Sequence, residues 1–474
     1  MDYIWTTVST LDFLSEKGGR SMKDDESFVA FVDRTLERRN ESSNIHKFFL
    51  QRSWHFFESK VQSWISSAIS GNHLKELGVY MSRQNPRIIP PSVFTCESLI
   101  SLGLQTLPSI QLPRHISFPR LKRLELLNFE VRDDNWNEQL FSNFRVLEEL
   151  ILKGLTVSMK FFSISVPTLK VLTVDTGRNE QNGIRNCVLK FDVPSLVSFS
   201  YTGYASKEFL CSSLLELVQA DLKFDFEEDS EETDGVAISR CLQSLEHAKR
   251  LTLNDKTLQA ICSARDQSSN SLAFHNVKIL NITDHMVSEL GLIDLLKATP
   301  SLESLVFAEY IDDFIEYYDV GEEDTEGDGD DDREEDDRDS TEGEADDDSE
   351  EDAADSMEGD NDHGSEDQVD VSEAAECASD DEIEAIDDYG YDSWVATMPN
   401  VENLLPHLQS VCFQQFAGNP TEMKWVVLIL KNAKALQKMT THYYDSDLRF
   451  TGAIGETEVM AVMPRIPRAS AGCV

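Results

Sequence analysis

A short apolar phrase, L-x-x-L-x-L with apolar substitutes, recurs along the first two thirds of the chain. It is clear in the stretches HLKELGVY, RLKRLELL and VLEELILK, and weaker where alanine, valine or phenylalanine replaces leucine. Eleven copies, spaced 21 to 31 residues apart, begin at Ile45, Leu74, Leu99, Leu121, Leu147, Leu169, Leu196, Leu217, Ala248, Val277 and Leu302. A period of this length is typical of a chain that stacks one structural unit on the next.

Each copy of the phrase predicts a short strand. Its second and third apolar residues alternate with polar ones, so they point to one face, and parallel stacking buries them as one ladder. The intervening stretches at 28–36 and 61–69 have helical spacing, and Gly71 is a plausible C-cap for the second. The pattern therefore predicts an α/β fold over residues 21–318, an irregular leucine-rich-repeat solenoid with parallel strands and convex-side helices. The alternative is an ordinary α/β domain with leucines spaced by chance.

Charge is concentrated in one segment. The chain has 87 acidic and 42 basic residues, and Asp319–Asp388 holds 37 of the acids but two of the bases. This tract has net charge 2 − 37 = −35, which leaves 40 − 50 = −10 for the remainder. Such a segment has too little apolar surface to fold, so we expect a long disordered insertion at residues 319–392.

The repeat pattern resumes after the acidic tract. Leu408, Val411 and Phe413 repeat the apolar phrase, and Asn419, Pro420 and Glu422 are typical of a helix start. A final strand is expected within 435–443. Residues 393–474 should thus form a last repeat and a domain that caps the open end of the solenoid.

Catalytic and metal-binding motifs are absent from the sequence. We find no GxGxxG, GxxxxGK[ST], HExxH or GxSxG, and the ten histidines lack ligand spacing. The eight cysteines include no CxxC pair, which favours free thiols in a reducing compartment. No apolar run approaches a membrane span. These features predict a non-enzymatic protein without cofactors, intracellular and either cytoplasmic or nuclear, with no membrane partner.

Function by binding is the remaining interpretation. In a parallel solenoid, the polar residues that alternate with the core leucines line the concave face. The mixed signs of these residues favour a protein partner over a specific nucleic acid, which would need a basic stripe. The candidate partner-binding residues are Glu76, Tyr80, Gln105, Arg123, Glu125, Glu149, Lys153, Asp175, Lys223, Arg250 and Asn254.

Several stretches resemble a known plant family. The segment LPHLQSVCFQQFAGNPTEMKWVVLILKNAKALQKMT, followed by MPRIPRASAGC, is similar to the FBD domain, and FVDRTLERRNESSNIHKFFL, HLKELGVY and FPRLKRLELLNF resemble the F-box/FBD/leucine-rich-repeat proteins. The resemblance implies a substrate-recognition subunit of a cullin-type (SCF) ubiquitin ligase. It also implies that residues 1–20 follow an F-box, the module that docks on the ligase adaptor subunit. Most of that module is missing, so we expect ligase docking to be impaired.

Two other interpretations of the chain remain open. It could be an acidic leucine-rich nuclear scaffold or histone-binding chaperone, or a product without a stable fold. The tract itself is either an inert solvated insertion or a lure for basic partners such as histones. Thr341, Ser349 and Ser379 each precede an acid by three residues, which predicts phosphorylation by acid-directed kinases.

Overall fold

The computed structural model describes fifteen stretches of the chain, and all of them lie within Met1–Tyr310 and Ile386–Val474. The described residues are 7–14, 22–39, 44–52, 58–81, 88–110, 112–113, 116–132, 141, 144–177, 182–226, 231–263, 272–283, 289–308, 404–416 and 418–443.

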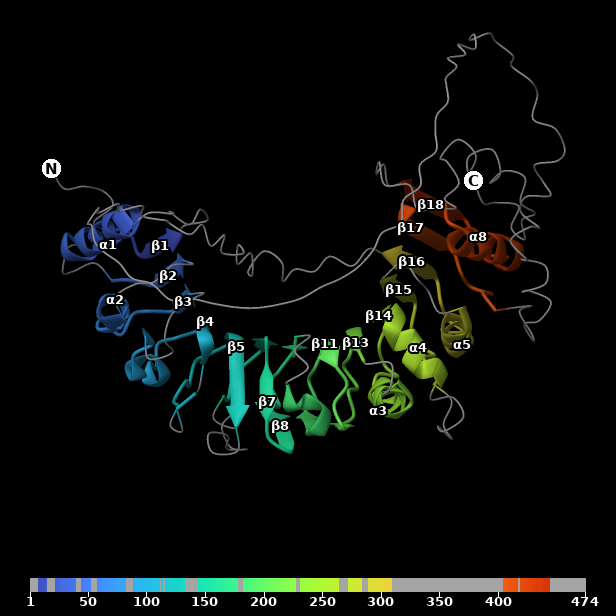
Figure 1. Ribbon diagram of the computed structural model, residues 1–474, viewed down its shortest axis with the longest axis horizontal. Coiled ribbons are helices and arrows are strands. Elements are labelled where there is room, and N and C mark those ends of the chain that lie inside the picture. The colour runs from blue at the N-terminus through green and yellow to red at the C-terminus, as the bar shows by residue number, and fades with distance from the viewer. Residues whose placement is uncertain are drawn as a thin grey trace, which may run out of the picture. The chain divides into compact units, whose positions relative to one another are not determined.

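One parallel sheet runs from the first of these stretches to the last (Figure 1). It has 15 strands, and its order follows the chain from β1 to β18, with β7 paired beside β5. The strands are β1 (Thr10–Leu14), β2 (Lys47–Arg52), β3 (Glu76–Met81), β4 (Ser101–Ile110), β5 (Arg123–Arg132), β6 (Glu149–Lys153), β7 (Thr156–Ser158), β9 (Val171–Asp175), β11 (Ser198–Tyr204), β13 (Gln219–Asp225), β14 (Arg250–Asn254), β15 (Ile279–Thr283), β16 (Ser304–Ala308), β17 (Ser410–Phe416) and β18 (Lys438–Tyr443). This confirms the predicted leucine-rich-repeat fold.

The apolar phrases align in register from strand to strand. Leu77 pairs with Leu102, Leu102 with Leu124, and Leu124 with Leu150. These leucines are at most 1% exposed, and so is Leu99, which opens its phrase before a strand begins. The hydrophobic effect on this ladder therefore holds neighbouring repeats together, and truncating any one buried leucine to alanine costs about 2–5 kcal/mol.

Helices cover one side of the sheet (Figure 1). Asp33 of the first helix accepts hydrogen bonds from Lys60 Nζ at 2.6 Å and Trp64 Nε1 at 2.7 Å, which joins it to the second. The predicted C-cap differs, since Asn72 rather than Gly71 has a positive φ, of 54°. The helices are α1 (Met22–Glu37), α2 (Glu58–Ile69), α3 (Glu231–Gln243), α4 (Asp255–Ser263), α5 (Glu289–Ala298) and α8 (Pro420–Asn432), with 3-10 helices η3 (Pro91–Thr95) and η5 (Gly183–Asn186).

The middle repeats differ from the prediction of convex-side helices. There a second parallel sheet, in the order β12–β10–β8, replaces them. Its strands are β8 (Phe161–Ser165), β10 (Val188–Asp192) and β12 (Glu208–Cys211). Their sequences FFSIS, VLKFD and EFLC are aromatic or β-branched and alternate, which favours a strand over a helix.

The sheet continues from β16 to β17, which follow each other in the sheet although residues 309–409 separate them in the sequence. β16 pairs with β17 in parallel, and the rings of Phe307 and Phe413 stack with centroids 4.6 Å apart. The helix start is confirmed, because Asn419 and Glu422 form a reciprocal capping box at the first turn of α8. The expected insertion at 319–392 and the candidate phosphorylation sites Thr341, Ser349 and Ser379 lie outside the described residues.

Two further observations concern the described part of the chain. All six of its cysteines are free thiols. No helix in these stretches is long and apolar enough to cross a membrane.

Candidate protein-binding face

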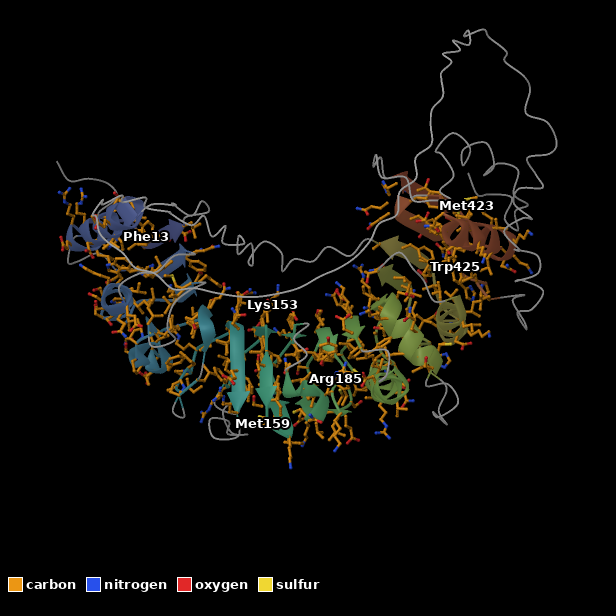
Figure 2. The ribbon with its side chains drawn as sticks, viewed as in Figure 1. Phe13, Lys153, Met159, Arg185, Met423 and Trp425 are labelled. Atoms are coloured by element: carbon orange, nitrogen blue, oxygen red, sulfur yellow. The ribbon has the colours of Figure 1, made fainter. Side chains whose placement is uncertain are left out.

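The side chains that alternate with the buried ladder form the second side of the main sheet, here called the open face. Figure 2 shows Lys153 on this side, away from the helices, whereas Trp425 lies where α8 packs on the sheet. On the first strands the open face consists of three aligned rows: Lys47, Glu76, Ser101, Arg123 and Glu149; Phe49, Gly78, Gly103, Glu125 and Ile151; Gln51, Tyr80, Gln105, Leu127 and Lys153.

Two aromatic rings lie flat along this face, each over a glycine of the next strand. The ring centroids of Phe49 and Tyr80 are 6.0 Å apart. A Cβ added at Gly78 would lie 2.6 Å from Phe49 Cε1, and one at Gly103 would clash with Tyr80 Oη. Any larger residue would displace the rings, so the two glycines create the space for this aromatic floor, defined as Phe49, Gly78, Tyr80 and Gly103.

A basic side chain closes one end of the aromatic floor. Lys47 Nζ lies 4.6 Å from the centroid of the Phe49 ring, within the range of a cation–π interaction. The same nitrogen is 3.9 Å from Glu76 Oε2. Lys47 therefore contacts an aromatic face and a carboxylate together.

An ion-pair cluster, defined as Tyr80, Arg123, Glu125 and Glu149, adjoins the floor. Arg123 Nη2 lies 3.1 Å from Glu125 Oε2, and Arg123 Nη1 pairs with Glu149 Oε1. The Tyr80 hydroxyl donates to Glu125 Oε2 at 3.2 Å. Burial opposes the charge of Arg123, but the hydrogen bonds and attraction of the two carboxylates outweigh it and raise the pKa of the guanidinium. Its side chain is still 38% exposed, so a partner can reach it.

The later strands carry an open face with fewer charges. Asn281 Nδ2 donates to Thr252 Oγ1 at 3.2 Å, and the hydroxyls of Ser410 and Ser304 are 3.0 Å apart. Asp221 faces Lys223 at 3.8 Å, and burial raises the pKa of its carboxyl although Lys223 acts in the opposite direction. Aromatic rings and paired charges thus gather on the first strands, while hydroxyls and amides predominate on the later ones.

Comparison with known proteins places this face in a family context. Residues 61–201 match the leucine-rich repeats of FBD-associated F-box protein At5g56370, and residues 401–440 match the FBD domain. By these two matches the chain is similar to the plant F-box/FBD/leucine-rich-repeat proteins. The first match spans α2 to β11 and includes the ion-pair cluster, and the second spans β17 and α8.

Individual relatives from Arabidopsis thaliana show the same relationship. F-box/LRR-repeat protein At5g41840 is 28% identical over 311 residues, which cover 60% of this chain and 57% of that protein. FBD-associated F-box protein At4g10400 is 26% identical over 66% of this chain and 70% of its own length. F-box/LRR-repeat protein At1g06630 is 27% identical over 64% of this chain and 75% of its own.

All eleven residues proposed from the sequence lie on strands of the main sheet, but two of them are buried. Gln105 is 4% exposed and Asn254 is 6% exposed. Asn254 donates to Phe224 O at 3.0 Å and accepts from Thr257 N at 3.2 Å, so it fixes the β14–α4 junction. Nine are exposed or half-exposed: Glu76, Tyr80, Arg123, Glu125, Glu149, Lys153, Asp175, Lys223 and Arg250.

Sequence reasoning missed Lys47 and Phe49. Phe49 stands between two core residues of the first repeat phrase, where the alternation should place a polar side chain. That break in the pattern was the available signal. Among the described residues, no three potential metal ligands of the His, Cys, Asp and Glu types come together.

Proposed function

We propose that this chain is a non-catalytic protein-recognition subunit, related to the substrate adaptors of cullin-type ubiquitin ligases. Its partner binds on the open face, over the aromatic floor and the ion-pair cluster. The alignments cover 57% to 75% of the length of these three relatives, whose names include an F-box. The ligase part of this proposal rests on those names. Docking on the ligase adaptor would require an F-box.

The observation that carries the proposal is the ordered cluster around Arg123. Its guanidinium is held between Glu125 and Glu149 while more than a third of the side chain stays exposed. Arginine and tyrosine are enriched among residues that dominate protein–protein binding energy, particularly when their positions are fixed before binding. The two acids beside the arginine disfavour a phosphate backbone and support a protein partner.

Removal of the aromatic floor tests this proposal. The double variant Phe49→Ser/Tyr80→Ser changes the open face without touching the buried ladder, and Leu210→Ser, at a side chain 41% exposed on β12, is the matched control. Quantitative affinity capture of the full chain from plant cells should recover the same partners with the wild type and the control. Each partner should fall at least about fivefold with the double variant, and an unchanged set of partners would rule out the open face.

A second function rests on the acidic tract, with net charge −35 over 70 residues. Such a segment would attract basic proteins such as histones by long-range electrostatics. Deletion of 319–388 should then abolish histone capture while partners of the open face are retained. Phosphate on Thr341, Ser349 or Ser379 would strengthen the attraction, and mass spectrometry of the cell-derived chain would detect it.

A further inference from the structure

A pocket of about 530 Å³ lies between the first strand and the first helix. Six of its lining residues are exposed: Val8, at 42%, Thr10, Asp12, Phe31, at 57%, Arg34 and Arg38. Phe31 lies in the stretch 28–36, for which the sequence predicts a helix, and α1 confirms that helix. The pocket is lined by Val8, Thr10, Leu11, Asp12, Phe13, Phe31, Arg34, Thr35 and Arg38.

The strand side of the pocket is a sheet edge. Within the described residues, β1 pairs with β2 alone, so the backbone groups on its other edge have no strand neighbour. Such an edge is a template for a further strand. In β1 the side chains of Leu11 and Phe13 point to the buried side, whereas Thr10, Asp12 and Leu14 are exposed on the open face.

The helix side of the pocket is one face of α1. Phe31, Arg34, Thr35 and Arg38 follow the spacing that places side chains on a single helical face. Another face of α1 packs against α2, because Asp33 accepts hydrogen bonds from Lys60 and Trp64 of that helix. The ring of Phe31 contacts Phe13 edge-on with centroids 6.0 Å apart, which fixes the apolar end of the pocket.

The charge of the pocket is positive. Arg34 and Arg38 are both exposed, and neither forms an ion pair with any described residue. Asp12 is the one acid in the lining and faces the open side of the strand. On the helix side, two guanidinium groups therefore adjoin an apolar surface formed by Phe13 and Phe31.

We propose that this pocket binds an extended segment of a partner protein, which joins β1 as a parallel strand and carries an acidic residue two positions before an apolar one. Because β1 and β2 are parallel, α1 runs back along β1, which brings Arg38 toward Thr10 while Phe31 lies beside Phe13. The acid therefore comes first along the peptide and pairs with Arg34 or Arg38. The apolar residue follows on the same face and packs on the two rings.

Short peptides provide the test, with the full chain as receptor. The probe is a fluorescent peptide TDTLTVT, whose even positions face the helix side. TKTLTVT reverses the charge, TVTLTDT reverses the order, and a version methylated on alternate backbone nitrogens removes edge pairing. Fluorescence polarisation should show binding of the first peptide, and at least about tenfold weaker binding of the other three.

Receptor variants complete the test. Arg34→Glu/Arg38→Glu should weaken TDTLTVT at least about tenfold and improve TKTLTVT. Arg120→Glu/Arg145→Glu changes the same charge at two exposed sites elsewhere and should leave both affinities unchanged. Thermal melting verifies that each variant is folded. The proposal would be overturned by equal binding of all peptides, by unchanged binding to the Arg34/Arg38 variant, by no peptide binding, or by a homodimer joined through β1. None of these outcomes bears on the open face.

Discussion

The ring of Phe49 lies over the Cα of Gly78 on the neighbouring strand, so closely that a Cβ at Gly78 would be 2.6 Å from Phe49 Cε1. Lys47 Nζ lies 4.6 Å from the centroid of the same ring. The orientation of the ring, and hence the position of the lysine charge, depends on the absence of a side chain at Gly78. Gly78 thus shapes the proposed binding face through the space it leaves for the ring of Phe49.

The variant Gly78→Ala should impair recognition more than folding. Because the ring is half-exposed, it can rotate out at a cost of about 1 kcal/mol, and it then no longer forms the flat floor. Affinity capture should lose the partners of the open face while the melting temperature falls by only a few degrees. Gly71→Ala is the control, since its Cβ would meet His73 Cδ2 at an ordinary 3.6 Å. Full partner capture by Gly78→Ala would contradict this role.

Much of the fold was predictable because the leucines at equivalent positions of successive repeats are all buried in the same way. Leu77 and Leu102 occupy equivalent positions, are fully buried and pair in register, so period and alternation were sufficient to assign them. The second sheet was missed because its strands follow no leucine phrase. Local alternation, rather than the repeat, carried that information.

The sequence predicts which side chains lie on the open face but not how far each of them is exposed. Alternation correctly placed Arg123 and Gln105 on the same side, yet Arg123 is reachable and Gln105 is 4% exposed. Depth depends on the neighbouring strands, which periodicity does not describe. The aromatic floor depends on Phe49 and Gly78 being register partners across 29 residues of sequence, and only the paired strands bring them together.

A second glycine, Gly291 on α5, should matter for the stability of the fold. Alanine inside a helix normally stabilises it by about 1 kcal/mol relative to glycine. Here the added Cβ would clash with the backbone oxygen of Leu258 on α4, which cannot move aside as a ring can. We expect Gly291→Ala to destabilise the protein by about 2 kcal/mol in chemical denaturation.

The neighbour of Gly291 provides the control. Leu290 is 50% exposed, so Leu290→Ala should change the free energy of unfolding by less than about 0.5 kcal/mol. Equal stability of Gly291→Ala and the wild type would contradict the close α4–α5 contact.

Tyr201 places a hydroxyl group inside the buried ladder, where that hydroxyl needs a hydrogen-bond partner. It is fully buried, and its hydroxyl donates to Tyr204 O at 2.5 Å. Tyr201→Phe removes this buried hydrogen bond and should cost about 1–2 kcal/mol in chemical denaturation at neutral pH. Thr35→Ser, which keeps its hydroxyl in a helix, should cost less.

The pH dependence of the same variant is a separate check. Burial raises the pKa of Tyr201 far above its usual value of 10.0. The neutral hydroxyl therefore contributes stability below pH 10, and this contribution is lost as the pH rises above 10 because the unfolded chain ionises first. The difference between wild type and Tyr201→Phe should accordingly shrink from pH 9 to pH 11. A constant difference over that range would contradict the assignment.

Glu148 joins two lysines of neighbouring repeats at the start of the strands, and its effect should appear in acid. Its carboxylate lies 2.9 Å from Lys122 Nζ and 2.9 Å from Lys170 Nζ. The hydrogen bonds from Lys122 and Lys170, with the attraction of their charges, lower the pKa of Glu148 from 4.5 to about 2. A lowered pKa means that the stabilising contribution is complete above pH 4.5 and disappears as the pH falls through about 2.

The variant Glu148→Gln isolates this contribution from the many other carboxylates. Since the Glu148 side chain is 37% exposed and both lysines lie at the surface, the wild type should melt only slightly higher than the variant at pH 7 in low salt. That difference should decline between pH 4.5 and pH 2, and 1 M salt should reduce it at pH 7 by screening both ion pairs. Lys170→Gln should reproduce part of the loss, while Lys190→Gln, at an exposed lysine on β10, should not. A difference that grows in acid would show that the carboxylate is not held by the two lysines.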